Sequence, residues 1–222
     1  MGEAVGAMLA SAAGLAINPL PLVAVVLVLG TRRARTNGPA VAAGWTVGLA
    51  GVVGTALAIG IGLAGGDGRP TWAAWLKLAL GAALWLLALR SWRGRPRAGR
   101  VTAPPPWMRT ADRLTAGSSF GLALGLAVAD PRNLALAVGG AVSVAASGTG
   151  TGGMALAAGL LVLIGSLGTL VPLGVHLARG ERADGVLGEW KAWTGAHNTA
   201  ITTTVAAVLG AAYLGDALTG LA

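Results

Sequence analysis

Long apolar runs alternate with short polar joins along the whole chain. Six runs are close to or above the ~20 residues that a helix needs to cross the hydrocarbon core of a bilayer. They cover residues 4–30, 39–64, 72–89, 117–146, 154–177 and 199–221. Glycine, proline and charged residues collect in the joins between them. This pattern predicts an all-α polytopic membrane protein with six transmembrane helices.

The composition excludes several classes of protein. Of the 222 residues, 55% are hydrophobic and only 11% are charged, whereas a globular domain has about 25% charged residues. So few charges cannot cover a water-exposed surface, which excludes an ordinary soluble enzyme. Cysteine is absent, which excludes disulfides, thiolate metal sites and thiol redox chemistry. Since no nucleotide-binding or hydrolase motif appears either, we expect no enzymatic activity, no cofactor and no metal site.

The net charge of +8 comes from basic residues that collect in alternate joins. The first, third and fifth joins hold 13 of the 16 lysines and arginines, the opposite joins hold only Arg69, and Lys77 and Arg132 lie inside spans. Basic loops stay on the cytoplasmic side of a membrane. This distribution predicts a multi-pass protein of the cell (plasma) membrane with both termini outside. The charge is then an orientation signal, and we expect no nucleic-acid partner.

The chain divides into two similar halves. A shift of 112 positions places Pro19 on Pro131 and carries the first span onto the fourth and the second onto the fifth without gaps. We therefore predict a first three-helix repeat over residues 1–92, a basic, proline-rich cytoplasmic linker over 93–116, and a second repeat over 117–222. Three spans per repeat give the halves opposite orientations, which is the 3+3 inverted repeat of many secondary transporters.

The second half has extra residues before its last span. Near residues 185–195, Val186, Trp190, Trp193 and His197 fall on one helical stripe. Such a stripe is typical of a short amphipathic helix in the cytoplasmic interface. An irregular loop anchored by the two tryptophans is the alternative.

Two spans contain, in their middle, the residues that normally start a helix. Asn18 precedes Pro19, with Pro21 two residues on, and Asp130 precedes Pro131. Asn or Asp caps a helix N-terminus, and proline at the first helical position loses no needed N–H. We therefore predict that spans one and four are each broken into half-helices. Their N-termini would present positive dipole ends and N–H groups to an anion; a plain proline kink is the structural alternative.

Charged side chains inside the spans are candidates for function, because each costs at least about 2.5 kcal/mol at the centre of a membrane helix. Asp130 is the acidic residue nearest mid-span, and Arg132 follows two residues later. One hypothesis makes Asp130 a proton-linked switch that frees Arg132 for an anionic substrate. The alternative is a helix cap that only neutralises Arg132. Lys77 and Asp216 lie near the outer ends of their spans, where we expect both to reach water.

Glycines recur at a spacing of four in two spans, at Gly117, Gly121 and Gly125 and at Gly44 and Gly48. Small residues at this spacing let membrane helices approach closely. We expect both sets to be packing surfaces.

Three short motifs carry a resemblance to a known group of proteins: I-N-P-L-P-L at residues 17–22, T-R-R-A-R at 31–35 and A-D-P-R-N-L at 129–134. With them the chain resembles the LysE superfamily of small exporters, and within it the GAP family of glycopeptidolipid- or sulfolipid-addressing proteins, over nearly its whole length. The resemblance implies six spans and movement of lipid-linked or other amphiphilic products toward the cell surface. Carried over by position, it implies a central substrate site formed by Asn18, Pro19, Pro21, Asp130, Pro131 and Asn133. From its charge and its place within the span, we add Arg132 to the expected substrate-binding residues.

The sequence therefore predicts a transporter that exports an amphiphilic or small anionic metabolite, with proton coupling as the hypothesis for its energy source. Its expected partners are the lipid bilayer and that substrate. One alternative is an amino-acid or cation exporter of the LysE type. Another is a non-transporting membrane subunit that docks an envelope-lipid synthase through the basic central loop. The oligomeric state stays open, and a homo-oligomer is compatible with the sequence.

The predicted topology can be checked by cysteine labelling, because the natural chain contains no cysteine. We expect Gly66→Cys to react with a membrane-impermeant thiol reagent on intact cells. Gly99→Cys should react only after the membrane is opened, because the arginine-rich join is cytoplasmic. Labelling of Gly99→Cys alone would reverse the orientation.

Overall fold

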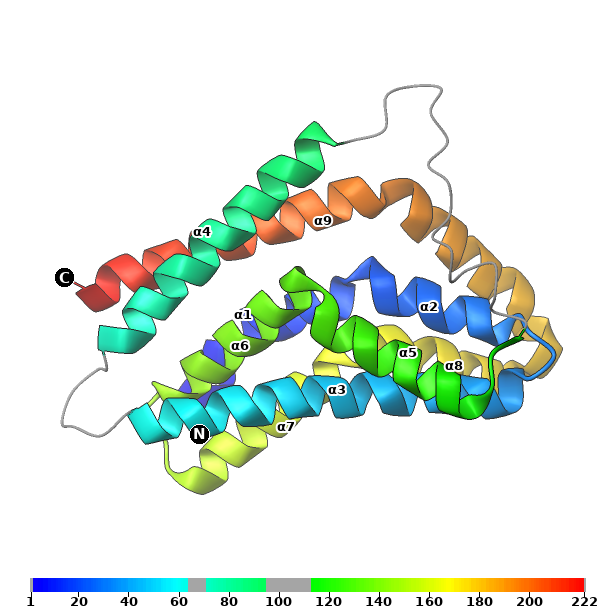
Figure 1. Cartoon of the computed structure of the whole chain (residues 1–222), viewed down its shortest axis with the longest axis horizontal. Coiled ribbons are helices and arrows are strands. Elements are labelled where there is room, and N and C mark those ends of the chain that lie inside the picture. The colour runs from blue at the N-terminus through cyan, green and yellow to red at the C-terminus, as the bar shows by residue number, and fades with distance from the viewer. Residues whose placement is uncertain (1, 64–70, 95–112, 222) are drawn as a thin grey trace.

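The computed structural model describes residues 2–63, 71–94 and 113–221, and this part of the chain is helical without strands (Figure 1). The all-α prediction is therefore confirmed. In chain order the elements are α1 (Gly2–Ile17), α2 (Pro19–Leu29), α3 (Ala34–Leu63), α4 (Thr71–Arg93), α5 (Ala116–Ala129), α6 (Pro131–Ala145), α7 (Thr151–Gly165), α8 (Leu167–Arg179), the 3₁₀ turn η2 (Gly180–Ala183) and α9 (Asp184–Leu221).

Three of these helices, α3, α4 and α9, are each long and apolar enough to cross a membrane. Three bent pairs also qualify when each pair is taken as one span: α1 with α2 (42°), α5 with α6 (70°) and α7 with α8 (59°). Up to six spans result. The first two breaks fall at the predicted positions, Asn18 and Asp130. The third, at Ser166, was not predicted, because breaks were expected only in spans one and four.

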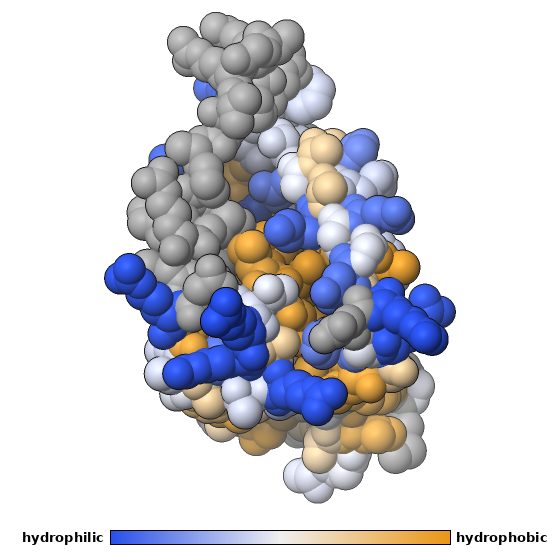
Figure 2. All heavy atoms as spheres, turned by 90° about the vertical axis from the view of Figure 1, so that its right-hand side faces the viewer, coloured by the Kyte–Doolittle hydropathy of each residue, from blue (hydrophilic) through white to orange (hydrophobic). Residues whose placement is uncertain are grey.

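Most of the described basic residues lie at one end of the bundle. This end faces the viewer in Figure 2, where hydrophilic residues are blue. These basic residues lie at the turn between α2 and α3, at the end of α4, just before α5 and around the junction of α8 and α9. The described members are Arg32, Arg33, Arg35, Arg90, Arg93, Arg113, Arg179, Arg182 and Lys191. The beginning of α1 and the end of α9 lie together at the opposite end (Figure 1). Most of the predicted linker, residues 95–112, lies outside the described part of the chain.

Contacts between helices of the two halves occur in matched pairs. By the 112-residue shift, α1 corresponds to α5, α2 to α6, and α3 to α7 with α8. Helix α1 packs on α7, and in the matching contact α5 packs on α3. Helix α3 packs on α6, and in the matching contact α8 packs on α2. Likewise α4 packs on α6, while α9 packs on α2, and α4 and α9 pack on each other. The buried side chains form two clusters. One is built around α1, α6 and α9, and the other around α2, the first half of α3 and α5.

The segment near 185–195 is helical and continues without interruption into the last span as α9. Its buried positions are Leu187 and Thr194, which lie on a different stripe from the one that the sequence indicated. Trp193 remains 60% exposed and stacks on His197, with ring centroids 4.6 Å apart. The tryptophan ring therefore faces outward from the bundle.

Only one of the two glycine sets packs against another helix. A Cβ at Gly44 would overlap the backbone carbonyl of Phe120, and one at Gly48 would lie 2.9 Å from the Ala127 Cβ. These glycines let α3 and α5 approach closely. Nothing lies within 4 Å of a Cβ added at Gly117, Gly121 or Gly125, so the expectation for these three is wrong within this chain. Spacing identifies a stripe of small residues, but not the direction in which it faces.

This difference predicts opposite effects for the same substitution. Gly44→Ala should lower the free energy of unfolding by about 1–3 kcal/mol, because the new methyl group meets rigid backbone. Gly121→Ala should raise it by about 0.5–1 kcal/mol, because alanine is the better helix former and the methyl group meets nothing. Equilibrium unfolding in detergent micelles measures both. Equal effects of the two variants would contradict the packing of α3 on α5.

Candidate functional site

The first helix break is built from Asn18 and two prolines. The Asn18 Oδ1 accepts a hydrogen bond from the Leu20 N–H at 3.1 Å, which caps α2. The Leu15 carbonyl, which loses its usual helical partner to Pro19, instead accepts a bond from the Asn18 N–H at 3.2 Å. Pro19 and Pro21 carry no N–H. Among the first three positions of α2 only Leu20 carries an N–H, and that N–H is bonded to Asn18, so the predicted presentation of free N–H groups to an anion does not hold at these positions.

The second break repeats this design with a charged cap. The Asp130 Oδ1 accepts from the Arg132 N–H at 3.0 Å and from the Arg132 Nε at 3.2 Å, so one oxygen both caps α6 and forms an ion pair. Pro131 occupies the first position of α6. The second oxygen, Oδ2, is buried and has no hydrogen-bond partner among the described residues. The carboxylate therefore has one free acceptor in a side chain that is only 6% exposed.

The two breaks meet. The Asn18 Nδ2 donates to the Asn133 Oδ1 at 2.6 Å, and both side chains are buried. Asn133 is fully buried, and its Nδ2 has no partner in the described part of the chain. Asn133, and not Asp130, is thus the residue of the second motif that Asn18 contacts.

Arg132 connects the second break to the last helix. Its Nη1 donates to the Thr202 Oγ1 at 2.9 Å, and the Thr202 hydroxyl in turn donates to the Asn198 Oδ1 at 3.4 Å. The Arg132 side chain is 32% exposed, against 6% for its partner Asp130. The sequence analysis missed Thr202. Its signal was a pair of polar residues four apart, which places Asn198 and Thr202 on one face of α9.

A third break packs against the first. Helix α7 ends at Gly165, whose carbonyl accepts a bond from the Trp45 Nε1 at 3.3 Å. A Cβ at Gly168 would lie 3.2 Å from Pro21, so α8 starts beside the start of α2. Sharp kinks without proline commonly occur at Gly/Ser pairs, and Gly165 and Ser166 form such a pair. That signal was available in the sequence and was overlooked.

The space between these groups is small. A central cavity of about 20 Å³ is lined by residues of α1, α2, α4, α6 and α9, and this volume suffices for about one water molecule. Asn18, Pro19, Arg132 and Thr202 line it, whereas Asp130 does not. The site is therefore closed to any larger ligand in this conformation. The lining residues are Gly14, Asn18, Pro19, Leu84, Arg132, Leu136, Ile201, Thr202, Val205 and Ala206.

An apolar groove of about 690 Å³ lies on the other face of α6, between α3, α4 and the end of α5. We call it the lateral groove. Its wall includes Val128, two residues before Asp130, and reaches Leu63 and Trp72 at the far end of the bundle. The remaining lining residues are Val47, Gly48, Gly51, Val52, Thr55, Ala56, Ile59, Gly60, Leu76, Leu124, Val138 and Val142. Such a lining suits hydrocarbon chains.

Lys77 and Asp216 form an ion pair that the sequence analysis did not predict. The Lys77 Nζ lies 3.0 Å from the Asp216 Oδ2, with the lysine side chain 15% exposed and the aspartate 58%. Lys77 is thus held by a partner, and does not simply extend into water as expected. No group of three or more His, Cys, Asp or Glu that could hold a metal ion occurs among the described residues.

The fold and the site together define an all-helical membrane protein with broken helices that meet at a buried polar cluster. The chain matches the SfLAP family, described as "Sap, sulfolipid-1-addressing protein", over residues 8–219, and it belongs to this family. That description names an addressing protein and no enzyme class. No curated protein and no solved structure matches the chain.

A double-mutant cycle measures the bond between the two breaks. We expect Asn18→Ala and Asn133→Ala to be coupled by about 0.6–1.7 kcal/mol in the free energy of unfolding, the range seen for hydrogen bonds between membrane helices. Asn37 supplies the control, because it is buried and its Nδ2 donates to the Leu114 carbonyl at 2.8 Å, away from the breaks. A cycle of Asn18→Ala with Asn37→Ala should show no coupling. Equal coupling in both cycles would contradict a specific bond.

Proposed function

We propose that this protein is a six-span exporter that moves an anionic amphiphile, lipid-linked or small, toward the cell surface. The membership in a sulfolipid-addressing family supports a role in lipid export or addressing. The single observation that carries the proposal is the Asn18–Asn133 bond, which joins two mid-span helix breaks into one polar cluster. Irregular backbone at this depth is tolerated where protein surrounds it or where it lines a cavity, and in transporters it marks the substrate site.

The architecture that we propose is a 3+3 inverted repeat with both termini outside, as in the LysE superfamily. Its support is the 112-residue shift that relates the breaks at Asn18 and Asp130, together with the matched helix contacts of the two halves. Besides the extra residues at the start of α9, the repeats differ in their second span. The second span of the first half, α3, is continuous, whereas its counterpart is broken at Ser166.

The proposed substrate site comprises Asn18, Pro19, Pro21, Asp130, Pro131, Arg132 and Asn133. Arg132 is its cation, and Asp130 neutralises it in this conformation through the Nε contact. A proton added to Asp130 would weaken this pair and free the guanidinium for an anionic group. Arginine suits this role because its planar donors match sulfate, phosphate or carboxylate oxygens. Loss of the proton would restore the pair and displace the anion.

The lateral groove supports an amphiphile rather than a fully hydrophilic anion. Its apolar wall begins beside the second break at Val128 and could hold hydrocarbon chains while the head group occupies the polar cluster. A cation or amino-acid exporter of the LysE type is less well supported, because Arg132 repels cations.

The second candidate function is a membrane subunit that docks a lipid synthase without transporting anything. The small central cavity favours it, since about 20 Å³ cannot hold a substrate. Reconstitution separates the two candidates. In proteoliposomes, an exporter should move an NBD-labelled phosphatidylglycerol, which is anionic, between leaflets faster than the matched zwitterionic phosphatidylcholine, as followed by dithionite quenching. Movement of neither lipid would favour the docking subunit.

Two substitutions test the roles of the charged pair in this assay. Arg132→Gln keeps a donor for Thr202 and removes the charge, so it should abolish the preference for the anionic lipid. Asp130→Asn keeps the helix cap and removes the titratable group. We expect this variant to insert normally and to exchange the lipid, but not to accumulate it in one leaflet under a proton gradient. Full gradient-driven accumulation would leave Asp130 as a cap only.

A further inference from the structure

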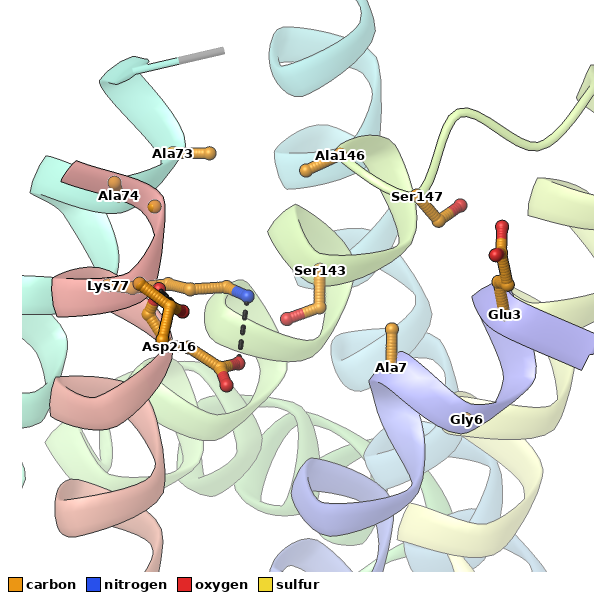
Figure 3. A pocket seen from close by; sticks show the side chains of 12 residues that line it. Glu3, Gly6, Ala7, Ala73, Ala74, Lys77, Ser143, Ala146, Ser147 and Asp216 are labelled. Atoms are coloured by element: carbon orange, nitrogen blue, oxygen red, sulfur yellow. Dashed lines mark hydrogen bonds and ion pairs between the residues drawn. The ribbon is translucent and has the colours of Figure 1, made fainter. Parts of the chain in front are cut away.

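Two separate cavities lie along the same helices, α1, α4, α6 and α9. One is the central cavity. The other, which we call the vestibule, has a volume of about 510 Å³ and lies at the end of the bundle where α1 begins and α9 ends (Figure 3). All four helices contribute to both cavities. Its lining includes Glu3 of α1, Lys77 of α4, Ser143 of α6 and Asp216 of α9.

A layer of nearly uniform thickness separates the two cavities. The nearest lining residues of the two cavities are seven positions apart on three of the helices and ten apart on the fourth. At 1.5 Å of rise per residue, this layer is about 10–15 Å thick. The flanking pairs are Ala7 and Gly14 on α1, Lys77 and Leu84 on α4, Leu136 and Ser143 on α6, and Ala206 and Asp216 on α9.

One aromatic side chain lies within this layer and contacts several of its helices. Tyr213 of α9 is 3% exposed, and its hydroxyl lies 2.6 Å from the Oγ of Ser11 on α1. The same hydroxyl lies 3.4 Å from the Leu136 carbonyl on α6. A Cβ at Gly139 would overlap the tyrosine ring, so α6 passes directly against it. Tyr213 thereby contacts two neighbouring helices at one level of the bundle.

The bond between these residues is a polar contact in an otherwise apolar layer. A phenylalanine could occupy the space of the ring without burying a hydroxyl, which costs free energy unless the group is paired. A hydroxyl pair can exchange its partner for water or for a substrate oxygen when the helices separate, whereas a purely apolar contact cannot.

The vestibule differs in charge from the central cavity. Among the described residues that line it, the charged groups are the carboxylates of Glu3 and Asp216 and the ammonium of Lys77, which together carry one net negative charge. Ser143 is 5% exposed and makes no hydrogen bond with the described residues, and in Figure 3 its hydroxyl points toward the side of Lys77 and Asp216. An anionic group held at Arg132 would be repelled in the vestibule. This charge distribution disfavours retention or re-entry of an anion at this end.

We propose that the interface of α1, α4, α6 and α9 is the substrate route, with the vestibule as its outer mouth and the Tyr213–Ser11 contact as its outer gate. This inference rests on the proposed export function. It adds to that function the residues that close the path and the end at which the anionic head group leaves.

Cysteine accessibility tests the gate without any substrate. On intact cells, Ser143→Cys should react with a membrane-impermeant maleimide, because it lies in the vestibule. Leu136→Cys borders the central cavity, which the intervening layer separates from the vestibule, so it should react at least about tenfold more slowly. Adding Tyr213→Ala should raise the labelling rate of Leu136→Cys toward that of Ser143→Cys. Tyr213→Phe, which removes only the hydroxyl and preserves the ring, should give a smaller increase.

Leu187→Ala is the matched control. Leu187 is 2% exposed and belongs to the other buried cluster, so its truncation should leave Leu136→Cys unreactive. The proposal is overturned if Leu136→Cys reacts rapidly in the parent chain, or if neither tyrosine variant changes its rate while Ser143→Cys still reacts. An unreactive Ser143→Cys would remove the vestibule as the outer mouth. Because the readout needs no lipid movement, failure of the gate and failure of export are separate results.

Discussion

The hydrogen bond between Asn18 and Asn133 joins two interruptions that a membrane helix would not otherwise tolerate. Hydrocarbon offers no water to backbone groups that a break releases, so each group needs a partner inside the protein. Local chemistry meets part of this need: Asn18 and Asp130 each cap the half-helix that follows. The amide–amide bond then fixes the two half-helices against each other, and the surrounding helices exclude lipid.

The close approach of the neighbouring helices follows from the same constraint. Trp45 of α3 donates its indole N–H to the carbonyl released at Gly165, so the third break also depends on a neighbouring helix. Gly44 and Gly48, on either side of this tryptophan, allow α3 to lie directly on α5. Helix α3 thus packs on the half-helix before the second break and satisfies the backbone at the third.

In this structure Arg132 is paired with Asp130, and the cavity that Arg132 lines is small. Asp130 uses one oxygen for the cap and for Arg132, while Arg132 also reaches Thr202 on α9. A change at this carboxylate would therefore act on the start of α6 and on the last helix together. In the proposed route, α9 also carries Tyr213, so one helix connects the cation of the central cavity with the outer gate.

The sequence alone determined the helical class, the breaks at Asn18 and Asp130 and the separation of basic residues to one end, because each depends on local chemistry or on composition. It did not determine that Asn18 donates a hydrogen bond to Asn133, or that Arg132 donates one to Thr202. It also did not determine that Lys77 of α4 forms an ion pair with Asp216 of α9. It also could not tell which glycine stripe faces a neighbour. These features depend on how each helix is rotated about its axis. Only packing of the whole bundle sets that rotation, since in lipid helices are selected by close fit and paired polar groups rather than by apolarity.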